Sequence, residues 1–492
     1  MIRNSLGKLL LIALIFALPY SDGHSQPKPD RAVVVIPGIL GSKLCSRASG
    51  AVIWGGADSY VLFPELALPP AYDVASLPHV PCGLIESVNV LGPFQIHQYD
   101  DLLATLHSMG YEDKKTLFVF PYDWRLSNQI SANGLETFIS QTLPSGDFDV
   151  VAHSMGGLVA KIWMSQNNRA RRVKTFVTFG TPYLGSATTF QTLDEGWGFW
   201  KNLFSKGLGT VRETTLTFPS LYELLPSYGN CCWFAVTPQK DFDPFSSTDW
   251  ERLRWLPAGF QTPERREWLR TTLSTARAIS KVKIPPGPMV VTVVNGLLPT
   301  TYRVVFDATD GHVVNYISGP GDGTVFQLSA ANGRLRDARA ALTRHATIFA
   351  DNASRQVLRW VLTEGPEPTK GTAPIVEAYL RTADGKSVAI SAASAEIVPS
   401  VLEPSQSAIL VVEVTGGPDL ANADLSNIVA VYEADRRPLD KPKVSTTNQT
   451  ANKTTTRIEF SFLAPSAEGA FSIVATLPSV ADIPDVALVV RK

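Results

Sequence analysis

The stretch Phe148-Asp-Val-Val-Ala-His-Ser154-Met-Gly-Gly-Leu-Val-Ala160 decides the fold. A short apolar run over residues 148–152 ends at Ser154, and a helical pattern follows with Leu158, Ile162 and Trp163 on one face. This order predicts a buried strand, a sharp turn and a helix, the layout of a nucleophile elbow, here with the pattern Ala-x-Ser-x-Gly. The same pentapeptide pattern is common in loops and at helix starts, so assigning a nucleophile elbow depends on the rest of the chain.

The residue types around Ser154 suit a nucleophilic serine. A serine hydroxyl attacks only when a base takes its proton, so its oxygen must project from a tight turn towards a histidine. Small side chains two positions away permit such a turn, and Ala152 and Gly156 occupy those positions. The helix start behind Ser154 also offers free backbone N–H groups to a developing oxyanion.

Composition indicates a globular protein of two or three domains, because the chain has 492 residues, 45% hydrophobic and 18% charged. The net charge of −1 gives no indication of a nucleic-acid partner. Residues 1–25 have the pattern of a secretory signal: Arg3 and Lys8, an apolar run over residues 9–18, and a small-residue exit at residues 23–25. We therefore expect a secreted or periplasmic protein, with an uncleaved membrane anchor as the weaker alternative.

The four cysteines can pair in three ways. We favour a Cys45–Cys82 disulfide that closes the segment between them, and leave open whether the adjacent Cys231 and Cys232 are bonded. The chain has no C-x-x-C motif and no histidine cluster. We therefore expect no metal and no cofactor.

The first two thirds of the chain alternate strands and helices, which predicts an α/β fold with a mostly parallel sheet. The expected strands lie at residues 32–36, 116–120, 148–152, 174–179 and 289–294, and the expected helices at residues 98–109 and 130–143. Residues 45–98 read as an irregular lid. Residues 187–280 interrupt the alternation and read as a cap, rich in tryptophan: Trp197, Trp200, Trp233, Trp250, Trp255 and Trp268. These tryptophans form the core of the cap, or line an acyl channel or a lipid-facing surface.

The last part of the chain has a different pattern. Residues 363–374 are polar and rich in proline, as in a linker. Apolar runs then recur at residues 375–380, 408–414, 428–432, 457–462 and 471–475, with a hairpin signal at Asp384-Gly385. Residues 375–492 are therefore predicted to form a separate all-β sandwich.

The order of candidate residues along the chain selects a catalytic triad. Hydrolases with a nucleophile elbow present serine, acid and histidine in that order. Only His312 and His345 lie far enough beyond the elbow, and His345 follows a carboxylate, Asp322, held in the turn Gly321-Asp-Gly323. We predict Ser154 as the nucleophile, Asp322 as the residue that orients the base, and His345 as general base and acid.

Two other carboxylates, Asp307 and Asp310, compete with Asp322 for the acid role. They would pair with His312, which lies too close to the start of a strand to reach a serine. The oxyanion donors are predicted to be the backbone N–H groups of Ile39, in the loop after the first strand, and Met155, directly after the nucleophile. An ordinary strand and turn is the alternative interpretation of the loop at Ile39.

Several stretches together resemble the lecithin:cholesterol acyltransferase family, which also includes phospholipid:diacylglycerol acyltransferases and lysosomal phospholipase A2. The resemblance covers roughly residues 31–362 and none of the β-domain. It rests on Val35-Ile-Pro-Gly-Ile-Leu-Gly-Ser, Tyr122-Asp-Trp-Arg, His153-Ser-Met-Gly-Gly, Phe179-Gly-Thr-Pro, Ser220-Leu-Tyr-Glu-Leu-Leu-Pro226 and Gly321-Asp-Gly-Thr-Val.

The resemblance implies an α/β-hydrolase with a cap, a disulfide-closed lid near the N-terminus, and an acyl-enzyme formed from a glycerophospholipid or related ester. It supports the same triad and oxyanion residues, and implies peripheral contact with a membrane or lipid particle. The block after Gly185 departs from the family, so the acyl acceptor, an alcohol or water, is not implied. Two alternatives remain: a secreted carboxylesterase or depolymerase that uses the β-domain to anchor a non-lipid ester, and a non-catalytic lipid-binding protein.

Overall fold

The structure is a computed structural model. It describes residues 29–56, 63–89, 95–97, 99–195, 208–236, 240–253, 256–364, 375–382, 387–391, 400–415, 429–433, 447–451, 455–475 and 486–490. The predicted signal, residues 1–25, lies outside the described residues. Among the described helices, none combines the length and the hydropathy required to cross a bilayer.

The centre of the fold is a six-stranded sheet in the order β15-β12-β9-β8-β1-β7. Every neighbouring pair in it is parallel, which confirms the predicted α/β-hydrolase class. The strands are β1 (Ala32–Ile36), β7 (Leu117–Val119), β8 (Phe148–His153), β9 (Val173–Phe179), β12 (Met289–Val294) and β15 (Arg339–Ala340).

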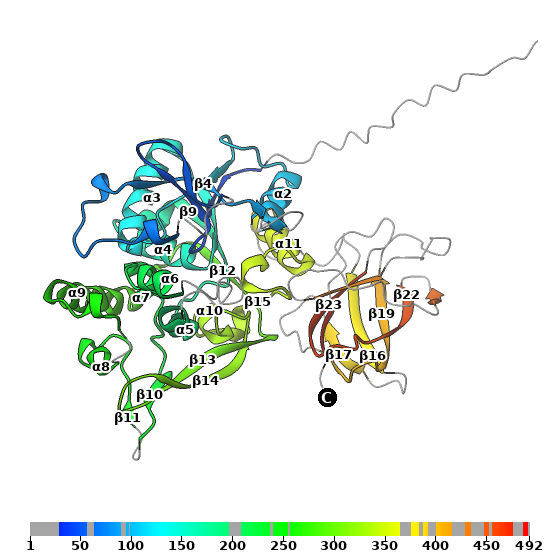
Figure 1. The fold of residues 1–492 in the computed structure, drawn as a ribbon. Helices are drawn as coiled ribbons and strands as arrows, with labels where there is room; N and C mark the ends of the chain where they lie inside the picture. Colours follow the sequence, from blue (N-terminus) through cyan, green and yellow to red (C-terminus); the bar gives the residue numbers. More distant parts are fainter. Residues whose placement is uncertain are drawn as a thin grey trace, which may run out of the picture.

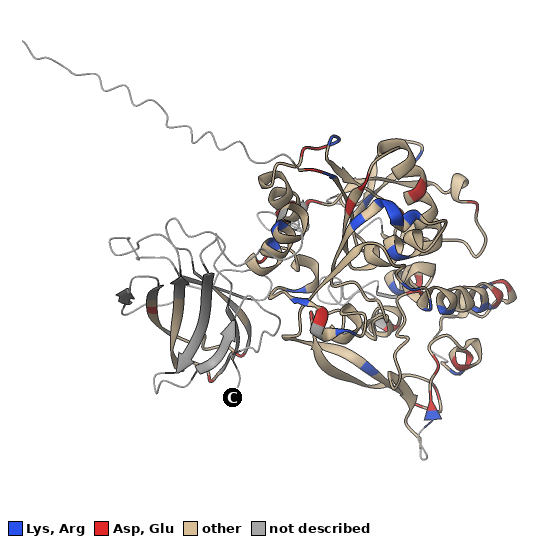
Figure 2. Ribbon diagram, turned by 180° about the vertical axis from the view of Figure 1, so that it is seen from behind, with Lys and Arg blue, Asp and Glu red and all other residues tan. Residues whose placement is uncertain are grey.

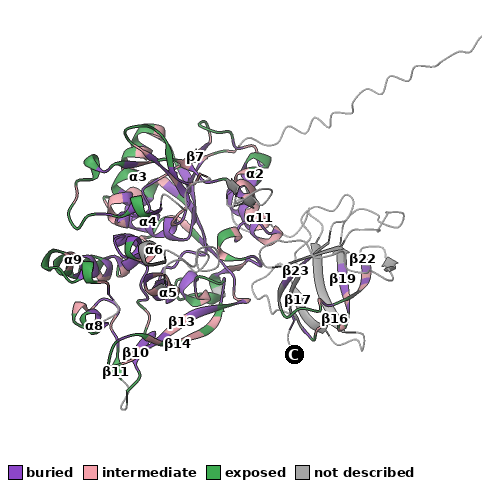
Figure 3. Cartoon of the chain, viewed as in Figure 1, coloured by how far each residue is buried: buried purple, intermediate pink, exposed green. Residues whose placement is uncertain are grey.

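Helices cover both faces of this sheet, which is why its strands are almost continuous apolar runs. Val34 and Val150 pack towards α3 (Asn128–Thr142) and α4 (Met155–Met164). Val33 and Val151 pack towards α2 (Asp100–Ser108) and α11 (Asn352–Arg359) on the other face. Figures 1 and 3 show the buried strands between these two helical layers.

The strand order creates a switch point beside β1. The chain runs from β1 to its neighbour β7, and then returns past β1 to β8 on the other side. In open parallel sheets, ligands bind in the crevice at the carboxyl ends of strands where such a reversal occurs. The loops that follow β1 and β8 carry Ile39 and Ser154, so the fold brings these residues to one crevice.

The lid segment, residues 45–98, is more regular than predicted. It contains a three-stranded antiparallel sheet in the order β3-β2-β4 and a separate hairpin of β5 and β6. These strands have three to six residues, too few for a strand periodicity to stand out. The Cys45–Cys82 disulfide joins β2 to β4 as predicted. The elements are β2 (Ser42–Ser46), β3 (Val52–Trp54), η1 (Phe63–Leu66), η2 (Val74–Ser76), β4 (His79–Leu84), β5 (Ser87–Asn89) and β6 (Gln95–His97).

The cap segment is mainly helical where it is described. Trp250 is fully buried between Phe190 and Tyr222, so this tryptophan belongs to the core of the cap. Trp197, Trp200 and Trp255 lie outside the described residues. Cys231 and Cys232 are joined to each other. The elements are α5 (Thr188–Glu195), α6 (Leu208–Thr215), α7 (Pro219–Tyr222), β10 (Cys232–Phe234), β11 (Lys240–Asp241), α8 (Ser247–Arg252), η5 (Ala258–Phe260) and α9 (Pro263–Ser280).

A long hairpin between β12 and β15 was not predicted. Its strands, β13 (Leu298–Phe306) and β14 (Val313–Gly321), join β10 and β11 in a second sheet of order β11-β10-β13-β14. The hairpin is labelled in Figure 1. β14 ends at Gly321, so Asp322 directly follows the hairpin, where its carboxylate contacts His345.

In the C-terminal region, the regular elements among the described residues are all strands, as predicted, in two sheets of order β17-β16-β19-β22-β21 and β18-β24-β23-β20. The predicted Asp384-Gly385 turn lies outside the described residues, but β16 and β17 on either side of it pair antiparallel. Figure 2 shows acidic and basic residues intermixed over the α/β part of the chain. The strands are β16 (Ile375–Thr382), β17 (Ser387–Ser391), β18 (Ser400–Leu402), β19 (Ser407–Thr415), β20 (Val429–Glu433), β21 (Thr447–Ala451), β22 (Thr455–Leu463), β23 (Gly469–Ala475) and β24 (Val486–Val490).

Candidate active site

Ser154 occupies a sharp turn between β8 and α4. Its backbone has φ 50° and ψ −127°, a conformation that non-glycine residues rarely adopt and that is typical of functional turns. A Cβ atom at Gly156 would lie 2.4 Å from the carbonyl oxygens of both Ile36 and Pro37. Glycine is therefore required at position 156, because the loop after β1 approaches this position closely.

The structure brings the three predicted triad residues together. The Nε2 atom of His345 lies 2.8 Å from the Oγ atom of Ser154, and its Nδ1 atom lies 2.7 Å from Oδ2 of Asp322. Ser154 is 5% exposed and Asp322 1%, while 12% of the His345 side chain is exposed. A base that bonds the nucleophile on one nitrogen and a carboxylate on the other is the arrangement that activates a serine.

Backbone groups hold the Asp322 carboxylate in place. Its Oδ1 atom accepts hydrogen bonds from the N–H groups of Thr324 at 2.9 Å and Val325 at 2.7 Å, which leaves Oδ2 for His345. The N–H of His345 donates to the Asp322 carbonyl at 3.0 Å. A Cβ atom at Gly180 would lie 2.9 Å from both Asp322 Oδ2 and His345 Nδ1, so only glycine fits beside this pair.

The predicted oxyanion donors flank the nucleophile. Met155 is the first residue of α4, where the N–H groups lack intrahelical partners. Ile39 follows Gly38, whose Cβ position would be 2.8 Å from the Cβ atom of Ser154. In the described part of the chain, neither the N–H of Ile39 nor that of Met155 has a hydrogen-bond partner. Two free donors beside a nucleophilic oxygen are suited to stabilise an oxyanion.

Two residues at this site were missed by the sequence analysis. The Tyr99 hydroxyl lies 2.8 Å from the N–H of Gly38 and 2.7 Å from Nδ1 of His153, and His153 Nε2 lies 2.8 Å from the His345 carbonyl oxygen. His153 has a signal in the sequence, because it directly precedes the nucleophile. Tyr99 has none, since it belongs to a distant segment before α2.

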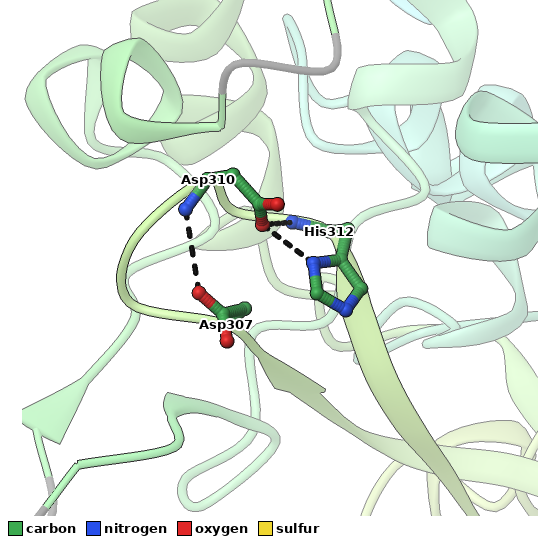
Figure 4. A group of neighbouring side chains, drawn as sticks. All are labelled: Asp307, Asp310 and His312. Carbon is green, nitrogen blue, oxygen red and sulfur yellow. Dashed lines mark hydrogen bonds and ion pairs between the residues drawn. The ribbon is translucent and has the colours of Figure 1, made fainter.

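The competing carboxylates, Asp307 and Asp310, do not reach Ser154. They lie in the turn between β13 and β14, where Oδ1 of Asp307 accepts from the N–H of Asp310 (Figure 4). The same oxygen also accepts from the N–H of Thr309. Oδ1 of Asp310 accepts from the His312 N–H and lies 2.5 Å from its Nδ1. One atom each of Asp307, Asp310 and His312 lies within 4.8 Å of the others, a spacing open to a metal ion. The hydrogen bonds within the turn are sufficient to explain why these three side chains lie together, with no metal ion required.

Comparisons with known proteins find similarity to one family over part of the chain. The sequence model of the family "Lecithin:cholesterol acyltransferase" matches residues 68–263. The chain is 25% identical over 250 residues to "Lecithin-cholesterol acyltransferase-like 4" of Arabidopsis thaliana, covering 44% of each protein. It is 27% identical over 143 residues to "Phospholipase A(1) LCAT3" of the same plant, covering 27% of this chain and 32% of the relative.

The chain therefore spans less than half the length of these two curated relatives. Among solved structures, "The crystal structure of Tle4-Tli4 complex" is similar over 68% of this chain and 98% of that chain, with 13% identity and a TM-score of 0.44. The elbow at Ser154 falls inside the segment that the family model matches. Residues 68–263 are therefore similar to the lecithin:cholesterol acyltransferase family, on a central parallel sheet of the α/β-hydrolase class.

Proposed function

We propose that this protein is a lipid acyltransferase or lipase that forms an acyl-enzyme on Ser154. One observation carries the proposal: Ser154, His345 and Asp322 form a continuous hydrogen-bonded series at the switch point of a parallel sheet. Similarity to the lecithin:cholesterol acyltransferase family supports a phospholipid or a related lipid ester as the acyl donor, because the relatives are named as an acyltransferase-like protein and a phospholipase.

In the first half-reaction, Ser154 Oγ forms a bond to the ester carbonyl carbon while its proton moves to Nε2 of His345. Asp322 Oδ2 accepts a hydrogen bond from Nδ1–H, which fixes the tautomer and stabilises the imidazolium. The N–H groups of Ile39 and Met155 donate to the oxyanion. The bond to the leaving alcohol then breaks, and its oxygen takes the proton from His345.

In the second half-reaction, an incoming hydroxyl attacks the acyl-enzyme. His345 takes the proton of this hydroxyl and returns it to Ser154 Oγ as the acyl–serine bond breaks. An alcohol acceptor gives a new ester, and water gives a free fatty acid. The acceptor is decided by how far the lid and cap exclude water from this step.

We also propose where in or outside the cell this protein acts. The signal pattern at residues 1–25 supports a secreted or periplasmic protein. A lipid ester substrate supports peripheral contact with a membrane or a lipid particle.

The test uses the purified mature protein, phosphatidylcholine vesicles, and the same vesicles with a sterol or a diacylglycerol. Acyl ester on the added alcohol identifies a transferase, and free fatty acid alone identifies a lipase or phospholipase. Ser154→Ala should lose both products and fluorophosphonate labelling while keeping its thermal unfolding midpoint. If short-chain esters are cleaved but neither lipid product forms, the lipid assignment fails. If Ser154→Ala retains activity, the mechanism fails.

A further inference from the structure

Three loops of the site are joined by a single series of hydrogen bonds that the reaction scheme does not use. The Gly38 N–H and the His345 carbonyl form its two ends, and the Tyr99 hydroxyl and the His153 imidazole lie between them. The three contacts measure 2.8, 2.7 and 2.8 Å. They connect the loop after β1, the residue before the nucleophile, and the backbone of the general base.

The two ends of the series fix the directions of the outer bonds, and the neutral state of His153 fixes the middle one. A backbone N–H only donates, so Gly38 donates to the Tyr99 oxygen, and Tyr99 is free to donate its own proton to Nδ1 of His153. A carbonyl only accepts, so Nε2–H of His153 donates to His345. A neutral His153 is therefore the Nε2–H tautomer, with Nδ1 as the acceptor. Burial, and then the proximity of His345, lower the pKa of His153 to about 3, in agreement with this assignment.

A second tyrosine, Tyr122, hydrogen-bonds to the carbonyl of the peptide that joins Pro37 to Gly38. The Tyr122 hydroxyl donates to the Pro37 carbonyl at 2.9 Å, while the Gly38 N–H of that peptide donates to Tyr99. The next N–H along the chain is that of Ile39. The orientation of the predicted oxyanion donor is thus set by a peptide held at both its polar atoms.

We propose that Tyr99 and His153 are positioning residues that keep the oxyanion loop, the nucleophile and the general base in one fixed arrangement. This inference rests on the proposed acyl-enzyme mechanism. Neither side chain touches the reacting atoms, and each acts through the backbone groups that it holds: Gly38 for Tyr99 and His345 for His153.

Packing makes this arrangement rigid. Tyr99 is fully buried and His153 is 4% exposed. The Tyr99 ring stacks on Phe349 with centroids 5.3 Å apart, and the His153 ring meets Phe349 edge-on at 5.3 Å. A Cβ atom at Gly41 would lie 2.8 Å from the Tyr99 hydroxyl, so the loop closes directly on the phenol.

The neutral state of His153 also serves the reaction. Its ring centroid lies 5.0 Å from that of His345, which becomes an imidazolium when it takes the serine proton. A charged His153 would repel that imidazolium, whereas a neutral one does not. A small displacement of catalytic groups is costly, because misplacement by about 1 Å lowers rates by about 100-fold.

The decisive variant is Tyr99→Phe, which removes one oxygen and leaves Gly38 N–H and His153 Nδ1 without their partner. We expect kcat to fall by about 10- to 100-fold, in line with loss of preorganisation, with KM within about twofold of the wild type. Inhibition by a trifluoromethyl ketone, whose serine adduct places an oxyanion in the same position, should weaken by the same factor as kcat/KM. A structural role alone would not produce this parallel loss.

The matched control is Tyr228→Phe. The Tyr228 hydroxyl donates to the Tyr302 carbonyl at 2.8 Å, a part-buried bond from a tyrosine hydroxyl away from this series. This variant should lose stability but keep kcat and ketone inhibition. A wild-type kcat in folded Tyr99→Phe, or an equal loss of kcat in both variants, would overturn the inference.

An independent pair of variants tests His153. Glutamine carries an N–H near the position of Nε2 and can still donate to His345, but leucine cannot. His153→Gln should therefore retain at least about tenfold more kcat than His153→Leu, about the rate effect of one oriented hydrogen bond. Equal activity of the two variants overturns the role of His153. Failure of the proposed function is separate, because it appears in the wild type and Ser154→Ala before these variants are compared.

Discussion

The Nε2 atom of His345 lies 2.8 Å from the Oγ atom of Ser154, although 191 positions separate the two residues in the chain. Both ends of this contact are fixed by the backbone. The Ser154 N–H donates to the Phe179 carbonyl at 2.8 Å, and the His345 N–H donates to the Asp322 carbonyl at 3.0 Å. Ser154 and His345 are therefore preorganised by the sheet and its loops. Substitutions of the residues that hold them should lower activity or stability in ways that can be predicted.

Asp322→Asn is expected to lower kcat by about 10³- to 10⁴-fold with little change in KM. The N–H groups of Thr324 and Val325 require an oxygen at Oδ1, so the amide would turn its NH₂ group towards His345 Nδ1. Nδ1 would then accept a hydrogen bond, and the proton of the neutral imidazole would move to Nε2. A protonated Nε2 cannot take the proton of Ser154.

Steady-state kinetics and the rate of fluorophosphonate labelling measure this effect. Asp310→Asn provides the control, because Asp310 lies in an exposed turn and bonds only within that turn. We expect it to keep the wild-type kcat. A similar kcat for Asp322→Asn and the wild type would remove Asp322 from the triad.

Five of the six strands of the central sheet could be predicted from the sequence, as could the three side chains that hydrogen-bond at its edge; the two-residue β15 could not. Most of the buried parallel strands leave a strong signal as apolar runs, and chain order together with the Gly-rich turn at Asp322 selects His345. The lid sheet was missed because its strands are short, and the second sheet was missed in part because β10 and β13 pair across a long stretch of the chain. β10, for example, pairs with β13 seventy or more positions later.

The place of Tyr99 in the active site could not be predicted from the sequence. It precedes a helix on the opposite side of the sheet from α4, and nothing in its neighbours marks it as polar and buried. Only the folded loop after β1 brings Gly38 to its hydroxyl. His153 could have been identified as a candidate from its position beside Ser154, but its partner could not.

Gly180→Ala should damage both stability and activity. Gly180 has φ +58°, and a methyl group there would lie 2.9 Å from Asp322 Oδ2 and His345 Nδ1. Gly146 provides the control, since its φ is +81° and no atom lies within 4 Å of its Cβ position. Both substitutions carry the left-handed backbone cost of about 1 kcal/mol. We expect kcat to fall at least about tenfold in Gly180→Ala alone, because misplaced catalytic groups lose rate steeply. Equal kcat in the two variants would contradict this account.

Stability should fall as the pH rises through the titration of Glu223. Burial raises the pKa of this carboxyl from 4.5 to about 7, against hydrogen bonds from Ser127 and Asn128 that lower it. Between these two values the unfolded state releases its proton first, so unfolding becomes more favourable with rising pH, by about 3 kcal/mol in total. Below pH 4.5 both states are protonated and the effect vanishes.

Urea unfolding at pH 5 and pH 8 tests this prediction. Glu223→Gln should remove most of the pH dependence, because the amide cannot ionise while its oxygen still accepts from the Asn128 N–H, as Glu223 does at 2.7 Å. Glu251→Gln, at an exposed position of α8, should leave the dependence unchanged. If the wild type and Glu223→Gln lose stability equally between the two pH values, another group is responsible.

Arg125→Lys is expected to destabilise the lid and lower the free energy of unfolding by about 2–4 kcal/mol. The guanidinium is 1% exposed, bonds both oxygens of Asp123 at 2.9 and 2.6 Å, and donates to the Leu66 carbonyl in η1 at 2.9 Å. An ammonium cannot make these bonds together, so either Asp123 or Leu66 loses its partner. Arg270→Lys changes an exposed pair with Glu267 in the same way and should not move the urea midpoint. Equal urea midpoints for both variants would show that the buried Arg125–Asp123 pair contributes no more to stability than a surface ion pair.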